Sequence, residues 1–395
     1  MAHASTFAEA RPKQLPSLTG LRFLSALLVF IFHVSCTTPA WTFLASKSQL
    51  HLFGSVVAEC GRIGVAFFFV LSGFVLTWSS RPVSNIFVFW WRRLLKIYPN
   101  HIATWLVAML FVGGSAAAPV TWMANLLLLH AWVPRYESFL SINIPSWSLC
   151  SEAFFYFLFP FLLPLVKKIP ENRLWLGLFA MGAAVFAIAV IGSHCLPVNP
   201  PLPEASPAGV WQFWFVYFLP VTRTLEFVMG IVVARIVMSG RWIRLGLRGA
   251  ALLAGASYVV ASLSPWLYSL AAVTVIPLSL LIAAAATADI ERRTAFLSHP
   301  FIVRLGELSF AFYMVHGLVL TGVRMLLGRD AYFGAAANVA IIGAELVASL
   351  FGAWLLHSLV ERPMMRLGTP TPPLIGHGVI PESQRQPQLS GGHGS

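Results

Sequence analysis

The chain has 395 residues, of which 58% are hydrophobic and only 10% are charged, and its mean hydropathy is +0.77. This composition excludes an ordinary soluble domain, in which about 25% of residues are charged, and it is typical of a membrane protein. The formal net charge of +12 would suit a nucleic-acid partner, but the basic residues fall in short loops between apolar segments, so we expect the lipid bilayer and no nucleic acid.

Apolar runs along the chain predict an all-α fold, a polytopic integral membrane helix bundle of about ten transmembrane helices. The runs lie near 18–35, 63–79, 101–114, 151–166, 173–192, 211–237, 246–261, 269–287, 308–327 and 336–357. A shorter run at 121–133 is expected to be re-entrant or interfacial, because a full crossing there would place the basic residues around Lys167 outside the cell.

The basic clusters also predict the orientation. With ten crossings both termini lie in the cytoplasm, and the chain is a multi-pass protein of the cell membrane. Residues 1–16 contain Arg11 and Lys13 but no apolar core of a secretory signal, so we expect a disordered cytoplasmic N-terminus. Residues 17–367 form one membrane domain, and residues 368–395, rich in Pro, Gly, Ser and Gln, are expected to be a disordered cytoplasmic tail.

The first apolar run carries two ionisable residues, Arg22 and His33. Their separation of eleven residues corresponds to about 1,100° of α-helix, close to three full turns, with a rise of about 16 Å. Both side chains therefore lie on one face, Arg22 near the entrance of the span and His33 near its middle. Ionisable groups at membrane depth are costly and mark a functional site by default.

A basic and aromatic stretch at 90–99 follows the second apolar run. Arg92, Arg93 and Lys96 fall on neighbouring faces of one helical turn, with Tyr98 two residues further on. Aromatic belts and snorkelling cations at a membrane boundary would explain this stretch by packing alone. Several fixed cations beside aromatic rings would equally suit the phosphates of a nucleotide-bearing donor.

Later polar residues also have a structural and a functional interpretation. We place Glu152 in the first turn of a helix, where the helix dipole stabilises a carboxylate without any function. Arg223 and Glu226 have the i, i+3 spacing of a mutually satisfied pair that holds helices together. His316 lies in the middle of an apolar run, where a hydrogen-bonded packing histidine is as good an explanation as a site residue.

In this order the motifs resemble those of the membrane-bound acyltransferase-3 family, over roughly residues 18–366. The first of them, Arg, ten residues, His, is supplied by Arg22 and His33. The others are the Gly61 to Phe74 pattern, the basic turn before Tyr98-Pro99, Trp147-Ser148-Leu149 with Glu152 and Tyr156, Arg223 with Glu226-Phe227 and Gly230, Leu305-Gly306 with Ser309 to His316, and Glu361-Arg362-Pro363. Each motif is weak alone, and their order is what makes the resemblance specific.

The resemblance implies an O-acyltransferase that moves a short acyl group from acyl-CoA, a co-substrate and not a bound cofactor, to a hydroxyl. The acceptor would be a sugar or a sugar-bearing secondary metabolite, such as a macrolide antibiotic or an exopolysaccharide. No bound cofactor is expected, and the four cysteines lack metal-ligand spacing, so no metal site is predicted.

Roles follow from the same resemblance. His33 would remove the acceptor proton, Arg22 would orient the donor or stabilise negative charge, and Glu152 would fix the His33 tautomer or position the acceptor. The expected donor-binding residues are Arg92, Arg93, Lys96 and Tyr98. The expected acceptor-binding or supporting residues are Trp147, Ser148, Arg223, Glu226 and His316.

Two departures from the family pattern and two alternative functions remain. Lys96 stands where relatives usually have a second arginine, which keeps the charge but loses bidentate phosphate recognition. Cys150 and Ser151 stand where relatives have a small residue and often valine, which alters the surroundings of Glu152. Buried Arg, His and Glu would also line the path of a transporter or flippase of a sugar-linked substrate, and a scaffold would use them only to pack helices.

Overall fold

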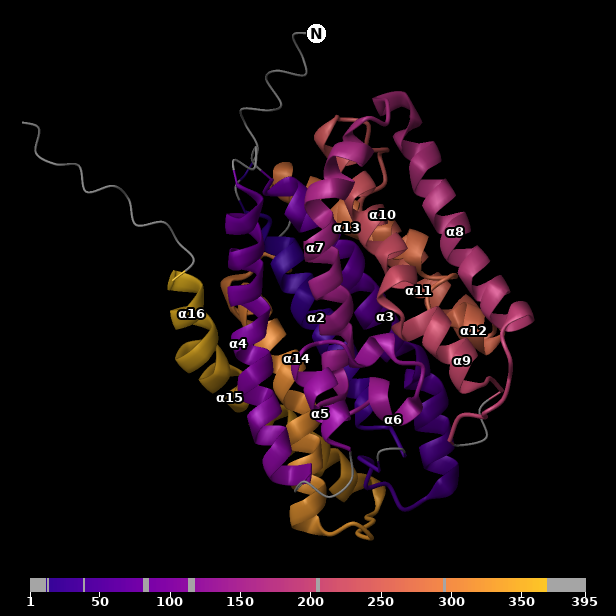
Figure 1. Cartoon of the computed structure of the whole chain (residues 1–395), viewed down its shortest axis with the longest axis vertical. Coiled ribbons are helices and arrows are strands. Elements are labelled where there is room, and N and C mark those ends of the chain that lie inside the picture. Colours follow the sequence, from indigo (N-terminus) through magenta and orange to yellow (C-terminus); the bar gives the residue numbers. More distant parts are fainter. Residues whose placement is uncertain are drawn as a thin grey trace, which may run out of the picture.

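The computed structural model describes residues 12, 14–37, 40–80, 85–112, 118–203, 207–293 and 296–367. The helices of this part form a bundle with shorter helices between the long ones (Figure 1). The α-helices are α2 (Pro16–His33), α3 (Lys47–Trp78), α4 (Ile86–Val112), α5 (Pro119–Leu126), α6 (Tyr136–Phe139), α7 (Trp147–Lys167), α8 (Leu174–Cys195), α9 (Val210–Phe213), α10 (Pro220–Met238), α11 (Leu247–Ser262), α12 (Trp266–Ser269), α13 (Val275–Ile290), α14 (Pro300–Leu327), α15 (Ala335–Leu356) and α16 (Arg362–Leu367). The all-α prediction is confirmed for these residues. The predicted tail 368–395 and most of the predicted N-terminal segment 1–16 lie outside them.

Six helical segments of the described part are long and apolar enough to cross a membrane. They are Pro16–His33, Lys47–Trp78, Ile144–Lys167, Glu171–Cys195, Pro300–Leu327 and Ala335–Leu367. Helices α11 and α13 are apolar but shorter, and α4 and α10 are long but each contains three charged residues. The membrane-type bundle is thus confirmed, whereas the number of about ten spans stays a prediction.

Several of the predicted runs have different boundaries in the structure. Helix α3 begins at Lys47, well before the run at 63–79, and α4 begins at Ile86, well before the run at 101–114. The run at 211–237 is interrupted, because a π-helical turn, Trp214–Phe218, ends before Pro220 begins α10. The residue before a proline disfavours the α conformation, which accounts for the break. The run at 269–287 is similarly split between the end of α12 and α13. Within 121–133 the helix α5 has eight residues, about 12 Å, which is too short to cross a hydrocarbon core.

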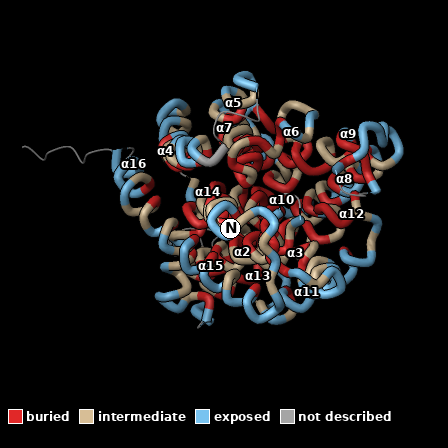
Figure 2. Tube along the Cα trace, turned by 90° about the horizontal axis from the view of Figure 1, so that it is seen from below, coloured by how far each residue is buried: buried red, intermediate tan, exposed pale blue. Residues whose placement is uncertain are grey.

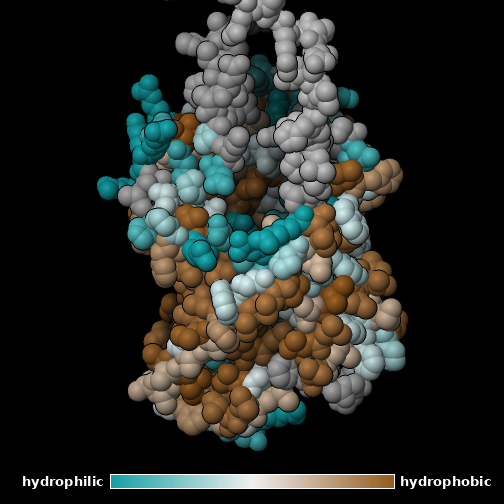
Figure 3. All heavy atoms as spheres, turned by 90° about the vertical axis from the view of Figure 1, so that its left-hand side faces the viewer, coloured by the Kyte–Doolittle hydropathy of each residue, from teal (hydrophilic) through white to brown (hydrophobic). Residues whose placement is uncertain are grey.

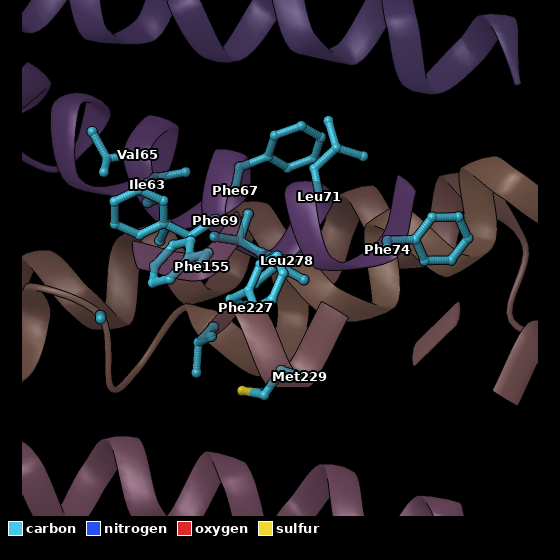
Figure 4. Close-up of a cluster of buried hydrophobic side chains, with 14 of the residues drawn as sticks. Ile63, Val65, Phe67, Phe69, Leu71, Phe74, Phe155, Phe227, Met229 and Leu278 are labelled. Atoms are coloured by element: carbon cyan, nitrogen blue, oxygen red, sulfur yellow. The ribbon is translucent and has the colours of Figure 1, made fainter. Parts of the chain in front are cut away.

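The core lies where α3, α7, α10 and α13 meet, and the buried residues gather there when the bundle is viewed along its axis (Figure 2). Figure 4 shows Phe69 of α3 lying close to Phe155 of α7 and Phe227 of α10. The ring of Phe155 stacks on Phe227 at a centroid distance of 4.9 Å and meets the edge of Phe69 at 5.1 Å. Such offset and edge-to-face contacts stabilise aromatic pairs beyond the burial of their area.

Helices α3 and α10 approach so closely that glycine is required on both sides of the crossing. A Cβ atom on Gly230 would overlap the carbonyl oxygen of Val70, and one on Gly73 would overlap the carbonyl oxygen of Phe227. Helix α2 packs between α3 and α14. A Cβ atom on Gly306 of α14 would overlap the carbonyl oxygen of Thr19 of α2. Small residues at such contacts are the usual means of close helix packing in membranes.

The outer surface is apolar over a wide area. Seen from the left-hand side of Figure 1, hydrophobic side chains cover a broad belt, and hydrophilic side chains gather above it (Figure 3). Large side chains in this surface are strongly exposed, with Leu263 82% and Leu326 87% accessible. An apolar surface of this extent marks contact with a partner or a lipid phase. The lipid bilayer is the phase that suits a belt around a helix bundle.

Candidate active site

A cationic cavity lies between the N-terminal half of α2 and the helices α3, α4, α7 and α14. Arg22 of α2, with Arg93 and Lys96 of α4, lines it together with Glu152 and Tyr156 of α7. Its volume is about 100 Å³. Three positive side chains against one carboxylate leave the lining with an excess of positive charge. The cavity is therefore suited to an anionic group such as a phosphate.

Aromatic rings hold two of these polar groups in place. The guanidinium group of Arg93 lies over the ring of Tyr156 at 5.7 Å and over that of Phe89 at 5.4 Å. The hydroxyl of Tyr156 donates a hydrogen bond to the carboxylate of Glu152. Cation–π contacts of this kind orient the guanidinium group without neutralising its charge.

The predicted position of Glu152 in its helix is wrong. Helix α7 begins at Trp147, after a 3₁₀ turn at Ile144–Ser146, and its first turn contains no acidic residue. Glu152 is the sixth residue of α7, so the helix dipole does not explain its presence. Its side chain belongs to the cationic cavity through Tyr156.

A second cavity, of about 180 Å³, surrounds His33. We call it the histidine cavity. His33 is the last residue of α2, so the prediction that it lies near the middle of the span is wrong. The helix end is nevertheless inside the protein, because the His33 side chain is 9% exposed. Arg22 and His33 share a helix face, but the three turns between them place them in different cavities.

His33 is oriented by a second histidine. Its Nδ1 lies 2.8 Å from Nε2 of His316, and Nδ1 of His316 lies 3.3 Å from the carbonyl oxygen of Phe312. A carbonyl only accepts, so neutral His316 carries its proton on Nδ1 and its Nε2 accepts from Nδ1 of His33. His33 is then left with an unprotonated Nε2, which is the atom that can act as a base.

The role predicted for Glu152 in fixing the His33 tautomer is therefore performed by His316. In the described part of the chain Glu152 makes no hydrogen bond to His33, and the two residues line different cavities. The prediction of His316 as a site-supporting residue agrees with this geometry. Its partner could not be read from the sequence, because the two histidines are 283 residues apart.

The two cavities adjoin each other. Val65 and Tyr313 line both of them, and the Tyr313 hydroxyl lies 3.0 Å from Oγ of Ser148. Ser148 lines the cationic cavity, and its neighbour Trp147 lines the histidine cavity. The start of α7 thus contributes one predicted residue to each of the two cavities. The two cavities therefore share a wall at Val65 and Tyr313.

Arg223 and Glu226 support the wall from behind. Their side chains are 3.0 Å apart and 2% and 0% exposed, and neither lines the two cavities. The guanidinium group of Arg223 lies 4.9 Å from the ring centre of Tyr217 and 5.1 Å from that of Phe69. These rings line the histidine and the cationic cavity, respectively. The ion pair agrees with the structural interpretation, but the pair is not mutually satisfied, because Nε and Nη2 of Arg223 and both carboxylate oxygens of Glu226 are buried without a hydrogen-bond partner among the described residues.

Arg92 and Tyr98 are predicted donor-binding residues that line neither cavity. Arg92 is exposed on α4, about 100° around the helix from Arg93. The Tyr98 hydroxyl donates to the carbonyl oxygen of Leu126 at 2.8 Å, which fixes the end of α5 against α4. The basic turn therefore has two roles. Arg93 and Lys96 line the cationic cavity, whereas Tyr98 holds α5 against α4.

Sequence reasoning missed three residues of the site. Tyr313 lies one helical turn before His316, and this spacing could have indicated it. Arg62, in the Gly61 to Phe74 pattern, lines the histidine cavity. Trp41 belongs to a loop without a recognisable signal; its ring lies 5.1 Å from that of His33, and its Nε1 donates to Oγ1 of Thr321 at 3.1 Å.

Comparison with known proteins shows the family to which the chain belongs. A family model described as an acyltransferase domain matches residues 15–358. The acyltransferase MdmB of Streptomyces mycarofaciens is 38% identical over 368 residues, which cover 90% of this chain and 93% of that protein. The peptidoglycan O-acetyltransferase OatA of Listeria monocytogenes is 27% identical over 187 residues, covering 42% of this chain and 26% of that protein. No solved structure matches the chain. The predicted resemblance is confirmed, and the chain belongs to the membrane-bound acyltransferase-3 family.

Proposed function

We propose that the chain transfers a short acyl group from acyl-CoA to a hydroxyl of a sugar or of a sugar-bearing secondary metabolite, such as a macrolide or an exopolysaccharide. The observation that carries the proposal is the pair of adjoining cavities, one lined by cations and the other by a histidine with a free base nitrogen. Acyl transfer needs these two environments in contact, since an anionic donor and a neutral alcohol must meet.

The donor would bind with its reactive end in the cationic cavity. Arg22, Arg93 and Lys96 supply charge-assisted hydrogen bonds of the kind that phosphates accept. The volume of about 100 Å³ is well below the roughly 300–1,000 Å³ of pockets that enclose whole drug-sized ligands. Most of acyl-CoA would therefore remain outside, with phosphate oxygens at the cations and the thioester next to the wall at Tyr313.

The chemistry at His33 needs one proton transfer and one bond exchange. Nε2 of His33 takes the proton of the acceptor hydroxyl while its oxygen attacks the thioester carbonyl. A new C–O bond forms, the C–S bond breaks, and the coenzyme A thiolate leaves and takes up the proton from His33. Arg22, which lines the cationic cavity and not the histidine cavity, is the cation placed to orient the donor.

The acceptor assignment draws on two observations. The relative OatA is named as a peptidoglycan O-acetyltransferase, which supports a hydroxyl acceptor for this chain as well. The histidine cavity is lined mainly by aromatic and aliphatic side chains with few polar groups, which suits a ring compound with hydroxyls. A macrolide and a sugar polymer both meet this description.

The proposal is tested with membranes that contain the chain, radiolabelled acetyl- and propionyl-CoA, and a panel of glycosides and macrolides. Labelled ester on at least one acceptor class is the expected result, and mass spectrometry of the product identifies the acylated hydroxyl. Membranes without the chain are the control. Absence of ester across both donors and the whole panel would contradict the proposal.

Replacing Arg93 or Lys96 by methionine is expected to raise the KM for acyl-CoA by about 10- to 100-fold, because each removes a charge-assisted hydrogen bond worth about 1.5–3 kcal/mol. The matched control is Arg92→Met, since Arg92 lies on the same helix but outside the cavity. Initial rates with acyl-CoA and with an acyl-pantetheine, which lacks the phosphates, measure the effect. Equal losses with both donors would refute a role in phosphate binding.

Replacing His316 by phenylalanine is expected to lower kcat by about 100-fold, the lower end of what a general base contributes, because His33 loses the acceptor that fixes its tautomer. His316→Gln retains an amide oxygen that can accept from Nδ1 of His33, so we expect part of the rate to return. The KM for acyl-CoA should stay unchanged in both variants. Identical activity of the two variants would show that His316 only packs the helices.

A further inference from the structure

We propose that Arg62 is the residue that binds the acceptor beside His33, by donating hydrogen bonds to a second oxygen atom of the acceptor. The inference rests on the proposed function and adds to it the chemistry of the acceptor. This acceptor is a neutral ring compound with one apolar face and an oxygen atom next to the hydroxyl that reacts. Sugar rings and oxygenated macrolactones both have this chemistry.

The first step of the argument is the position of Arg62. It lies on α3 and lines the histidine cavity together with His33. Its Nη1 donates to the carboxylate of Glu59 and, at 2.9 Å, to Oγ of Ser269. Its guanidinium group lies 5.4 Å from the ring centre of Trp266. These contacts come from α3 itself and from α12, and they hold the side chain in one place at the cavity wall.

The second step is the hydrogen-bonding capacity that remains. A guanidinium group has five N–H donors, and both hydrogen bonds of Arg62 leave from Nη1. Nε and Nη2 are therefore available to a ligand in the cavity. The side chain is 13% exposed, so the guanidinium group is not sealed from that space. A planar donor group of this kind suits two neighbouring oxygen atoms.

The third step concerns charge. Glu59, whose side chain is 4% exposed, forms an ion pair with Arg62 and compensates its positive charge. The pair as a unit is neutral, in contrast to the excess of positive charge in the cationic cavity. A second anionic ligand is therefore not expected beside His33. Arg62 would instead donate hydrogen bonds to neutral oxygen atoms, such as those of hydroxyl, ether or ester groups.

The fourth step is the shape of the remaining wall. Aromatic side chains surround the cavity and offer faces against which an apolar ring face can pack. Among them are Trp41, Tyr136, Trp147, Phe213, Tyr217 and Trp266. The volume of about 180 Å³ corresponds to about six molecules of liquid water at about 30 Å³ each. Because His33 and Arg62 both line this cavity, we expect it to take one ring, or one edge of a larger ring, with the reacting hydroxyl toward His33 and the next oxygen toward Arg62.

The test compares acceptor pairs that differ by one oxygen atom. One arm uses a methyl glycoside and its deoxy analogue lacking the oxygen next to the acylated hydroxyl, and the other uses a macrolactone aglycone and its corresponding deoxy analogue. In the wild type the deoxy compound should show a KM about 10- to 100-fold higher, because Arg62 is left without its partner. In Arg62→Met the parent compound should show the same rise and the difference within the pair should vanish.

Two further variants separate this role from folding. Arg62→Lys keeps the ion pair with Glu59 and should retain part of the preference. The double variant E59Q/R62M removes both charges, so that no carboxylate is left buried without a partner. This double variant should keep the thermal stability of the wild type and still lack the preference for the parent compound over its deoxy analogue. The KM for acyl-CoA should change by less than about threefold in all variants, since the donor binds in the other cavity.

Binding keeps this test independent of turnover. Quenching of tryptophan fluorescence by the two parent compounds reports occupation of the histidine cavity, because Trp41, Trp147 and Trp266 line it. If the wild type binds a parent compound and Arg62→Met does not, the inference holds even when no ester forms and the proposed function fails. If Arg62→Met binds both parents as well as the wild type does, or retains the preference within a pair, the inference is wrong.

Discussion

Replacing His33 by alanine should reduce ester formation by about 10²- to 10⁴-fold, the contribution of a positioned general base. The hydroxyl of an alcohol is a weak nucleophile at neutral pH, and Nε2 of His33 is the nitrogen left free by the hydrogen bond to His316. The loss should fall on kcat. The KM for acyl-CoA should stay within about threefold, because His33 lies outside the cationic cavity.

The matched control is His194→Ala, which removes an exposed histidine from α8 and should leave the rate unchanged. Rates are measured at equal amounts of folded protein, and the thermal unfolding of the two variants in detergent is compared with that of the wild type. A His33→Ala protein that folds and still forms ester at the wild-type rate would remove His33 from the mechanism.

Replacing Gly230 by alanine should have the largest effect on stability. The new Cβ would overlap the carbonyl oxygen of Val70 and lie 2.8 Å from the amide nitrogen of Phe74, both in the backbone of α3. Backbone atoms cannot rotate away, so α3 and α10 would have to separate. Overpacking of a well-packed core commonly costs about 1–3 kcal/mol, and the backbone contact places this substitution at or above the upper end.

A second glycine gives the control for this prediction. Gly255 lies in α11 with open space where its Cβ would be, and alanine there should be neutral or stabilise the helix by up to about 1 kcal/mol. The midpoint of thermal unfolding and the yield of monodisperse protein in detergent measure both variants. Equal midpoints for Gly230→Ala and Gly255→Ala would mean that the helices do not cross as closely as the structure shows.

The positions of the long helices could be predicted from the apolar runs, since a chain in a bilayer must satisfy its backbone within helices or barrels. Their ends could not, because α3 and α4 begin in polar or aromatic segments that precede the runs at 63–79 and 101–114. Boundaries inside apolar runs were harder to predict. Around the break, residues 213–221 are all apolar or aromatic, so no periodicity marks it, although Pro220 was a local signal for it. Helix α7 begins at Trp147, directly after the 3₁₀ turn at Ile144–Ser146. Glu152 therefore lies beyond the first turn of the helix.

The residue types of the candidate site could be predicted from the sequence, but the contacts between those residues could not. The spacing of Arg22 and His33 correctly indicated one helix face, but a rise of about 16 Å is enough to place the two ends in separate cavities. The contact between His33 and His316 depends on the packing of α2 against α14, which no local pattern specifies. Lys96, a departure from the family pattern, still brings its charge to the cationic cavity.

Formation of ester and movement of acceptor, followed in the same proteoliposomes, test the central claim most directly. Purified wild-type protein is reconstituted, radiolabelled acetyl-CoA is supplied on one side, and the acceptor glycoside or macrolide carries a second label. We predict that acetyl label becomes attached to the acceptor in the wild type and not in His33→Ala. Movement of the acceptor across the bilayer without any acetyl ester would contradict the account and would identify the chain as a transporter.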